Sequence, residues 1–462
     1  MAGIGFVLKK LSQKDNLIGS MQAFTHAVIA SSGPWLFTVL SLGIIIAAGD
    51  YFTSHGAVEI FRSIIIYNFA FSLIITGPIY MVCTRFLANE IHSKDLTYSI
   101  GMLYGAALVI TIIQLPLSIW YYFFYSKITS LIAINAVSNY MLIIMIWLAG
   151  IFLSAMKNYG VTTYSFLAGI IIAVITSSYL ADSYGTLGMI FGFNLGLSLI
   201  VAIMGARILI EYPYRPKEPL KFLKYFSKYW ELALSGLLYN LGSWADKFIM
   251  WFSPQALKAK GSSTFYMYPN YDSAMFLAYL SIVPALAIFV YQIETDFYQK
   301  YVKFFNDCLN NANLNKIYDN QQKLINSFVR NSTVVFILQA SIAITLILVA
   351  PHIFRFIHVN YTQMGIFRFG IIGATFQIFF LFFTIILAYF DNRKGVLKCY
   401  LLFCILNILF TFGTLYLGFD YYGSGYSLAA IISFMYAAHL CIKNLNELPY
   451  VSFISNNTSI QL

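Results

Sequence analysis

An acid and a base stand side by side in an otherwise apolar stretch, LYNLGSWADKFIMWF, which runs from Leu238 to Phe252. They are Asp246 and Lys247, and Asn240 precedes them by about two helical turns. If the stretch crosses a lipid bilayer, one ionised side chain near the centre costs roughly 2.5–3.5 kcal/mol. Such side chains persist in membranes when they are paired, hydrated or functional, so this stretch is a candidate transport path.

A helix turns about 100° per residue, so residues three and four positions apart share one face. This spacing places Asp246 on one polar or small stripe with Gly242, Tyr239, Ser235 and Glu231. A second stripe carries Lys247, Ser243, Asn240 and Gly236. Leucines and aromatic residues fill most other positions. We therefore predict that the polar sector of this helix lines a hydrated cavity.

Two structural interpretations of the charged pair stay open at this point. Both residues could lie near the outer membrane boundary, where the long stem of Lys247 reaches the interface. Alternatively, Asp246 and Lys247 could pair with other helices only to hold the bundle together. Neither of these interpretations needs a substrate.

Further polar residues fall inside apolar segments. Asn68 is a candidate for the same path, and Arg368 lies one or two turns into its segment, deeper than an anchoring residue needs. Arg85 is better explained as an anchor at a cytoplasmic helix end. Glu294 and Asp296 flank a predicted cytoplasmic boundary, where a solvated face explains them better than acid–base chemistry.

Glycine, proline and tryptophan recur at matching places in the two halves of the chain. SSGPWLFT, near the start, and NLGSWADK share a Gly-x-Trp pattern, and each following apolar segment carries a proline. Paired interruptions of this kind mark the binding path in many secondary transporters. We predict that Trp35 lines the path, with hinges or helix interruptions at Gly33, Pro34, Gly242, Pro78 and Pro284.

The composition requires a membrane around these residues. The 462 residues are 60% hydrophobic and only 10% charged, with a mean hydropathy of +0.74. An ordinary soluble domain is about 25% charged, and one soluble core could not bury this much apolar surface. The net charge of +10 is spread over short loops, so no nucleic-acid partner is expected.

Spanning helices need about 20 mostly apolar residues, and the apolar runs are continuous rather than alternating, which favours helices over strands. The fold class predicted is an all-α polytopic membrane protein with twelve transmembrane helices in two pseudo-symmetric six-helix lobes around a central cavity. The spans are 21–48, 61–90, 97–124, 134–156, 161–181, 186–210, 229–253, 272–295, 332–350, 363–390, 396–418 and 424–446.

The distribution of bases sets the predicted orientation. With the N-terminus in the cytoplasm, 21 of the 28 Lys and Arg residues lie on the inner side, as the positive-inside rule requires. The opposite orientation inverts this ratio. Both termini are therefore predicted to be cytoplasmic.

The lobes are predicted to join at a basic, proline-containing linker. Residues 1–210 form the N-terminal lobe, 211–228 the cytoplasmic linker and 229–462 the C-terminal lobe. Residues 296–331 are an amphipathic cytoplasmic insert in the second lobe. The N-terminal lobe begins with either a short amphipathic surface helix over residues 4–18 or a plain basic flank.

Several chemistries lack their sequence patterns. The five cysteines show no CxxC or Cys/His ligand spacing, so neither a metal site nor a disulfide is expected. No Walker A, GxSxG or HExxH pattern occurs. We expect no enzyme activity and no cofactor, and the sequence does not indicate whether an ion drives transport.

Three segments carry a resemblance to a known family. MAGIGF at the start, SSGPWLFT in the first span and YNLGSWADKFIMWF in the seventh resemble the PelG family, the inner-membrane transport component of bacterial Pel exopolysaccharide secretion. The similarity extends over the whole chain. It implies a fold of the flippase superfamily that includes lipid II, O-antigen and multidrug transporters.

The resemblance also implies substrate, partners and location. The substrate would be Pel, a cationic, galactosamine-rich polysaccharide, crossing the bacterial inner membrane beside a cytoplasmic glycosyltransferase and membrane regulatory subunits. A cationic polymer favours acids in its path, which suits Asp246 and Glu231. Lys247 does not suit it simply, and pairing with an acid on a neighbouring helix would explain it.

Two alternatives stay open. One is a cation-coupled drug or lipid-linked oligosaccharide flippase of the same fold. The other is a polytopic membrane glycosyltransferase or acyltransferase, which needs a catalytic base and a donor site on one membrane face.

Overall fold

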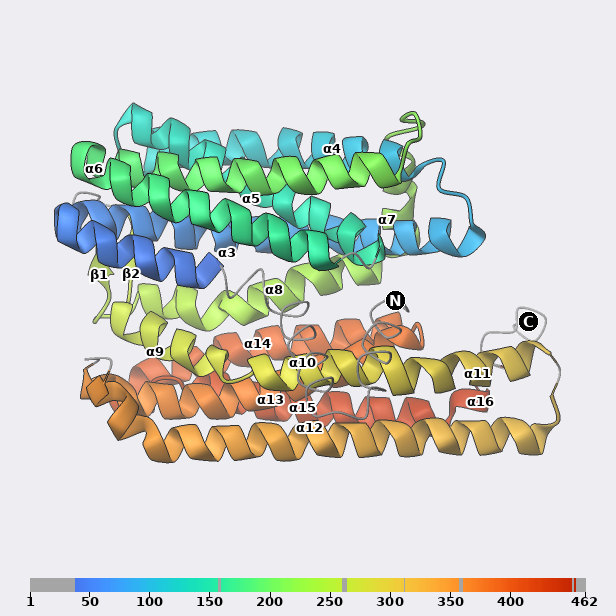
Figure 1. Ribbon diagram of the computed structural model, residues 1–462. Coiled ribbons are helices and arrows are strands. Elements are labelled where there is room, and N and C mark those ends of the chain that lie inside the picture. Colours follow the sequence, from blue (N-terminus) through green and yellow to red (C-terminus); the bar gives the residue numbers. More distant parts are fainter. Residues whose placement is uncertain are drawn as a thin grey trace, which may run out of the picture. The chain divides into compact units, whose positions relative to one another are not determined.

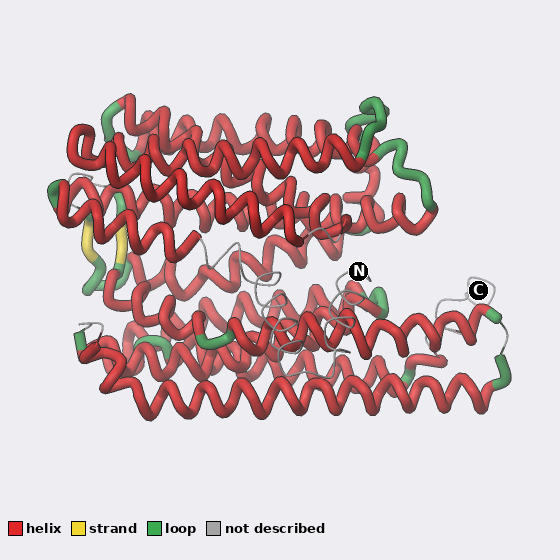
Figure 2. Tube along the Cα trace, in the orientation of Figure 1, coloured by secondary structure: helices red, strands yellow, loops and turns green. Residues whose placement is uncertain are grey.

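The computed structural model describes residues 38–156, 159–259, 264–310, 312–356, 360–450 and 453. Gly33, Pro34, Trp35 and the surface helix predicted over 4–18 lie outside the described residues. Helices make up nearly all of the described chain, and Figure 2 shows one short strand pair among them. This confirms the all-α membrane fold class.

The described chain forms two compact units. The N-terminal unit spans Gly33–Pro269, and the described residues of the C-terminal unit begin at Asn270. Figure 1 shows the helices of each unit packed side by side along most of their lengths. The lobe boundaries predicted from sequence, which put residues 229–462 in the C-terminal lobe, stay a prediction. By its contacts, α8 (Trp230–Trp251) belongs to the N-terminal unit.

The elements of the N-terminal unit follow one another through short connections. They are the helix Thr38–Phe52, α3 (His55–Ser93), α4 (Ser99–Ile119) with the π-helical turn η1 (Trp120–Tyr125), α5 (Ser130–Met156), α6 (Tyr159–Glu211), the 3₁₀ turn η2 (Lys221–Leu223), α7 (Lys224–Lys228), α8, and the antiparallel strands β1 (Leu257–Lys258) and β2 (Tyr266–Met267). Helix α3 packs against α4, α5, α6 and α8 and is the central element of this unit.

The C-terminal unit combines short helices with the long helix α12. Its elements are α9 (Pro269–Leu280), α10 (Val283–Gln292), the π-helical turn η3 (Ile293–Phe297), α11 (Tyr298–Leu309), α12 (Leu314–Phe356), η4 (Tyr361–Gln363), α13 (Met364–Tyr389), α14 (Arg393–Leu417), η5 (Phe419–Tyr421), α15 (Ser424–Asn446) and α16 (Leu448–Tyr450). Helix α15 packs against both α13 and α14, and these three helices form the core of the unit.

Each predicted span overlaps a helix of the described chain. In the part of the chain that the structure describes, nine helices are long and apolar enough to cross a membrane. Helix α6 contains two of the predicted spans, because its backbone turns at Gly185 with φ +54° and ψ −129°, a conformation suited to glycine. The helix Thr38–Phe52 and α8 complete the twelve. Helix α8 has 22 residues, enough for a bilayer, although its polar stripe lowers its hydropathy.

Spans eight and nine differ from the prediction in detail. The eighth is interrupted at Ser281 and Ile282, between α9 and α10. The helices predicted within 296–331 are extensions of spans: α11 follows α10 through η3, and the second helix is the start of α12. Helix α12 has 43 residues and is about 65 Å long, roughly twice the hydrocarbon thickness. Figure 1 shows α11 alongside the first half of α12, and we call this pair the hairpin.

Candidate functional site

Helix α8 is held against α3 by a contact between two glycines. A Cβ atom on Gly77 would lie 2.7 Å from the carbonyl oxygen of Gly236, and a Cβ on Gly236 would lie 2.5 Å from that of Gly77. Only residues without a side chain allow two helix backbones to approach this closely. Pro78, which we predicted to be a hinge or a helix interruption, follows Gly77, and α3 continues through it.

Asn240 takes part in the same contact. Its side-chain amide donates a hydrogen bond to the backbone carbonyl of Leu73 on α3, at 3.0 Å. The bond lies just over one turn before Pro78, whose missing N–H frees the neighbouring carbonyl of Ile74 rather than that of Leu73. Gly236 and Asn240 thus fix which face of α8 meets α3.

The charged pair lies deep within the protein. Asp246 is 0% exposed, and the ammonium of Lys247 lies 3.2 Å from each of its carboxylate oxygens. The same ammonium donates to the backbone carbonyl of Ser243 at 3.2 Å. We expected Lys247 to pair with an acid on a neighbouring helix. In the structure its flexible side chain bends about 100° around α8 and also reaches the carboxylate of the adjacent residue, Asp246.

The stripe that contains Asp246 is turned away from the contact with α3. Asp246 follows Asn240 by six residues, which puts their directions about 120° apart around the helix. Glu231 and Ser235 on this stripe are also buried, at 8% and 1% exposed. The hydroxyl of Ser235 donates to the carbonyl of Glu231 at 2.6 Å, within its own helix. Tyr239 and Gly242 complete the stripe, half-buried and buried. Most of the stripe is therefore packed rather than open, and the hydrated cavity along it stays a prediction.

Asn68 lies in a different cluster of the N-terminal unit. Its amide nitrogen donates to Asn139 Oδ1 on α5 at 2.9 Å, and its amide oxygen accepts from the hydroxyl of Tyr122 at 2.5 Å. Asn139 donates in turn to Asn194 on α6 at 2.8 Å. Asn194 donates to the backbone carbonyl of Asn135 at 2.9 Å.

This asparagine chain joins α3, α5, α6 and η1 in a membrane-spanning bundle. Hydrogen bonds between small polar side chains stabilise membrane helix pairs where packing alone gives little preference for one arrangement. The sequence shows three asparagines in apolar runs, but their spacing does not show that they bond to one another. The role of Asn68 in the path stays a prediction.

The C-terminal unit holds the remaining predicted positions. Pro284 is the second residue of α10, directly after the interruption of span eight. Arg368 is exposed in the second turn of α13. The structure therefore gathers Asp246, Lys247 and the Glu231 stripe on α8 and places Arg368 in another unit.

Sequence reasoning missed a polar junction in the C-terminal unit. Asp296, in η3, accepts hydrogen bonds from Lys300 at 2.8 Å, Arg330 at 3.0 Å and Asn331 at 3.3 Å, and also from the hydroxyl of Ser327. Partial burial alone would raise the pKa of Asp296, but the hydrogen bonds from Lys300 and Ser327 and the Lys300 charge lower it to about 2. We expected Asp296 to lie on a solvated face. Its hydrogen bonds instead connect η3 to α12.

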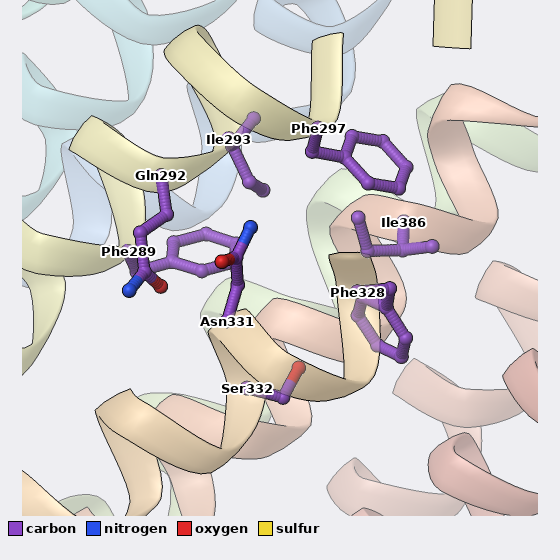
Figure 3. Close-up of a pocket in the computed structure, with 8 residues that line it drawn as sticks. All are labelled: Phe289, Gln292, Ile293, Phe297, Phe328, Asn331, Ser332 and Ile386. Carbon is purple, nitrogen blue, oxygen red and sulfur yellow. The ribbon is translucent and has the colours of Figure 1, made fainter. Parts of the chain in front are cut away.

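A small cavity lies beside this junction. Figure 3 shows three aromatic rings at its wall, from Phe289, Phe297 and Phe328, with the side-chain amides of Gln292 and Asn331. Asn331 belongs to both the cavity and the junction. A π-helical turn such as η3 inserts one extra residue and often marks a functional position in a helix.

The comparison with protein families decides the relationship. The model of the PelG family, described as "Putative exopolysaccharide Exporter (EPS-E)", matches residues 1–453. The chain belongs to the PelG family. This confirms the resemblance carried by the three sequence segments. No curated protein sequence matches the chain.

The fold of this PelG-family chain is shared with solved transporters. It is similar to a MOP superfamily transporter from Pyrococcus furiosus, with a TM-score of 0.60 and 12% identity over 91% of this chain and 96% of that one. It is also similar to the inward-facing conformation of a multidrug resistance MATE family transporter, with a TM-score of 0.60 and 14% identity over 91% and 99%. The outward-facing conformation of such a transporter gives 0.59 and 12% over 92% and 96%. Family and fold together identify a multi-pass membrane transporter of the exopolysaccharide exporter family.

Proposed function

We propose that this PelG-family transporter moves Pel-type exopolysaccharide, a cationic and galactosamine-rich polymer, across the bacterial inner membrane. The observation that carries the proposal is the Asp246 carboxylate, 0% exposed within a membrane helix and bonded to Lys247. A buried acid suits a substrate with free amino groups. Family membership supports the polysaccharide class.

The pairing geometry suggests how the acid meets its substrate. In the absence of polymer, Lys247 neutralises Asp246, so the carboxylate is not left as an isolated buried charge. An ammonium group on a passing sugar can replace the Lys247 ammonium at the same oxygens. The flexible lysine stem then withdraws, and the exchange keeps the local charge balanced.

The remaining parts of the proposal follow the family. The path is a flippase-like central cavity between two lobes, with Trp35, Asn68 and Arg368 as further lining residues. The linker and both termini face the cytoplasm. A cytoplasmic glycosyltransferase and membrane regulatory subunits of a Pel synthase deliver the chain, and polymer synthesis or an ion gradient drives it outward.

Asp246→Asn tests the proposal. The substitution keeps size and removes charge, so we expect surface polymer to fall several-fold while protein level and membrane insertion stay unchanged. Ser341→Ala is the control, because its exposed hydroxyl donates to the carbonyl of Ile337 within α12, away from the Asp246 stripe, and the change leaves the charge intact. Equal secretion by the Asp246→Asn strain and the wild-type strain would overturn the role of Asp246.

A second transport function is favoured by the similar structures, two of which are named as multidrug resistance transporters. Expression in a drug-sensitive strain, followed by growth on toxic cationic dyes, separates the two. Resistance without any effect on polymer export would favour drug or lipid-linked oligosaccharide transport.

An enzyme of polymer synthesis is the alternative from another class. Purified protein incubated with radiolabelled nucleotide-sugar should form no polymer if the chain only transports. Polymer made by the purified chain alone would replace the transporter proposal.

A further inference from the structure

The segment between α6 and α8 forms a surface fixed at the edge of the membrane. Helix α6 is long and apolar enough to cross a membrane, and we predict the same of the 22-residue α8, so residues 212–229 should start and finish at a membrane boundary. The segment carries five bases, Arg215, Lys217, Lys221, Lys224 and Lys228, against one acid, Glu218.

The backbone of this segment lies tightly on α4. A Cβ atom on Gly101 would lie 1.9 Å from the carbonyl oxygen of Lys217, and one on Gly105 would lie 1.7 Å from that of Pro219. Phe222 is 0% exposed, and the ammonium of Lys221 lies 3.0 Å from the centre of the Tyr98 ring. These contacts hold the segment in one place and determine which side chains face outward.

The outward side chains combine charge with apolar surface. Arg215, Lys217 and Lys224 are exposed, and Leu220 and Leu223 beside them are 48% and 38% exposed. We call these five residues the basic linker surface. Bases interleaved with apolar side chains are typical of segments that lie among lipid headgroups.

We propose that the basic linker surface binds the phosphate groups of anionic phospholipids in the leaflet next to it. Charge complementarity and the position between two spanning helices favour a lipid surface over a protein partner. Each base near an anionic membrane strengthens binding, and the attraction decreases with distance over the screening length of the salt solution. The proposal is independent of what the transporter carries.

Native mass spectrometry of the purified full chain with phosphatidylglycerol and phosphatidylcholine of matched acyl chains tests it. We expect the wild type to retain phosphatidylglycerol in preference. The variant Arg215→Gln/Lys217→Gln/Lys224→Gln should lose that preference by about tenfold or more. The control Lys303→Gln/Lys316→Gln/Lys323→Gln removes the same charge from the hairpin and should keep it.

A charge-preserving variant, Arg215→Lys/Lys217→Arg/Lys224→Arg, should bind phosphatidylglycerol like the wild type. Loss of binding in this variant as well would indicate that substitutions in the linker cause misfolding. Equal phosphatidylglycerol retention by the linker variant would overturn the proposal. Equal loss of phosphatidylglycerol in the hairpin control would also overturn it, because that result indicates a net-charge effect. Full competition by inorganic phosphate would overturn it too, because that result indicates a site for free anions.

Discussion

At the scale of single residues, the pair Asp246–Lys247 could stabilise the helix bundle, bind the substrate, or do both. Two variants distinguish these roles. Losing Lys247 leaves the carboxylate of Asp246, which is 0% exposed, without this partner, and breaking a buried pair in this way costs about 3–5 kcal/mol. Lys247→Met should therefore lower the thermal unfolding midpoint of the purified protein in detergent. Asp246→Asn differs, because Lys247 is partly exposed and keeps an amide oxygen beside it. The double variant Asp246→Asn/Lys247→Met removes both charges of the pair and should recover most of the stability lost in Lys247→Met.

Export provides the second measurement on the same variants. If Asp246 meets the polymer, the double variant should be stable and still secrete several-fold less than the wild type. Recovery of both stability and secretion would show that the pair only holds the bundle together.

The sequence was informative at this scale about which residues are unusual, and less so about their partners. The cost of charge in lipid singled out Asp246 and Lys247 without a structure. That Lys247 turns to its neighbour depends on rotamers and surroundings, and that Asn68 bonds to Asn139 depends on helix contacts distant in sequence. Asp296 was judged by its place at a boundary, although its donors lie up to 35 residues away.

At the scale of helices, the Gly77–Gly236 contact makes a prediction about packing. Gly236→Ala adds a methyl group 2.5 Å from a backbone oxygen, and such overpacking typically costs about 1–3 kcal/mol. Gly205→Ala is the matched control, because a Cβ there meets nothing within 4 Å and alanine favours the helix. We expect the first variant to unfold at a lower temperature and the second at the same or a higher one. Equal midpoints would mean that the helices separate easily.

The hairpin makes a second prediction at this scale. Asp296→Asn weakens the bonds from Lys300 and Arg330, so hydrogen exchange in α11 and the first half of α12 should speed up. Asp319→Asn is the control, because the Asp319–Lys323 pair is more than half exposed and such pairs contribute little. Equal exchange rates in both variants would contradict the role of Asp296 in holding η3 to α12.

The pH dependence of this tie follows from the direction of the shift. The pKa of Asp296 in the folded protein, about 2, is below its unfolded value near 4, so the carboxylate stabilises the fold above the unfolded value. That stability decreases as the pH drops from about 4 towards 2. Exchange in the wild-type hairpin should therefore show no contribution from Asp296 titration between pH 5 and pH 7.

At the scale of the whole molecule, disruption of the gene is the informative measurement. An exporter that receives finished chain should leave polysaccharide inside the cell when it is lost, whereas an obligatory part of a synthase should leave none. Intracellular polymer detected by a lectin, compared with surface polymer, distinguishes the outcomes.

Hydropathy predicted the helices well because bilayer thickness sets the length of an apolar run. It did not predict the continuity of α12, which leaves the number of crossings unchanged, whereas Pro284 had indicated a break close to the one between α9 and α10. The grouping of α8 with α3 depends on Gly77 and Gly236 meeting across 159 positions of chain, and no local pattern contains that information.

The glycine contact has a consequence for motion. Where two backbones touch without side chains between them, one helix can hardly slide past the other without a clash. Helix α8 and Asp246 should therefore move together with the bundle around α3, although the linker separates α8 from that bundle in the sequence. If Asp246 moves during transport, it must move together with this bundle, because α8 cannot shift alone.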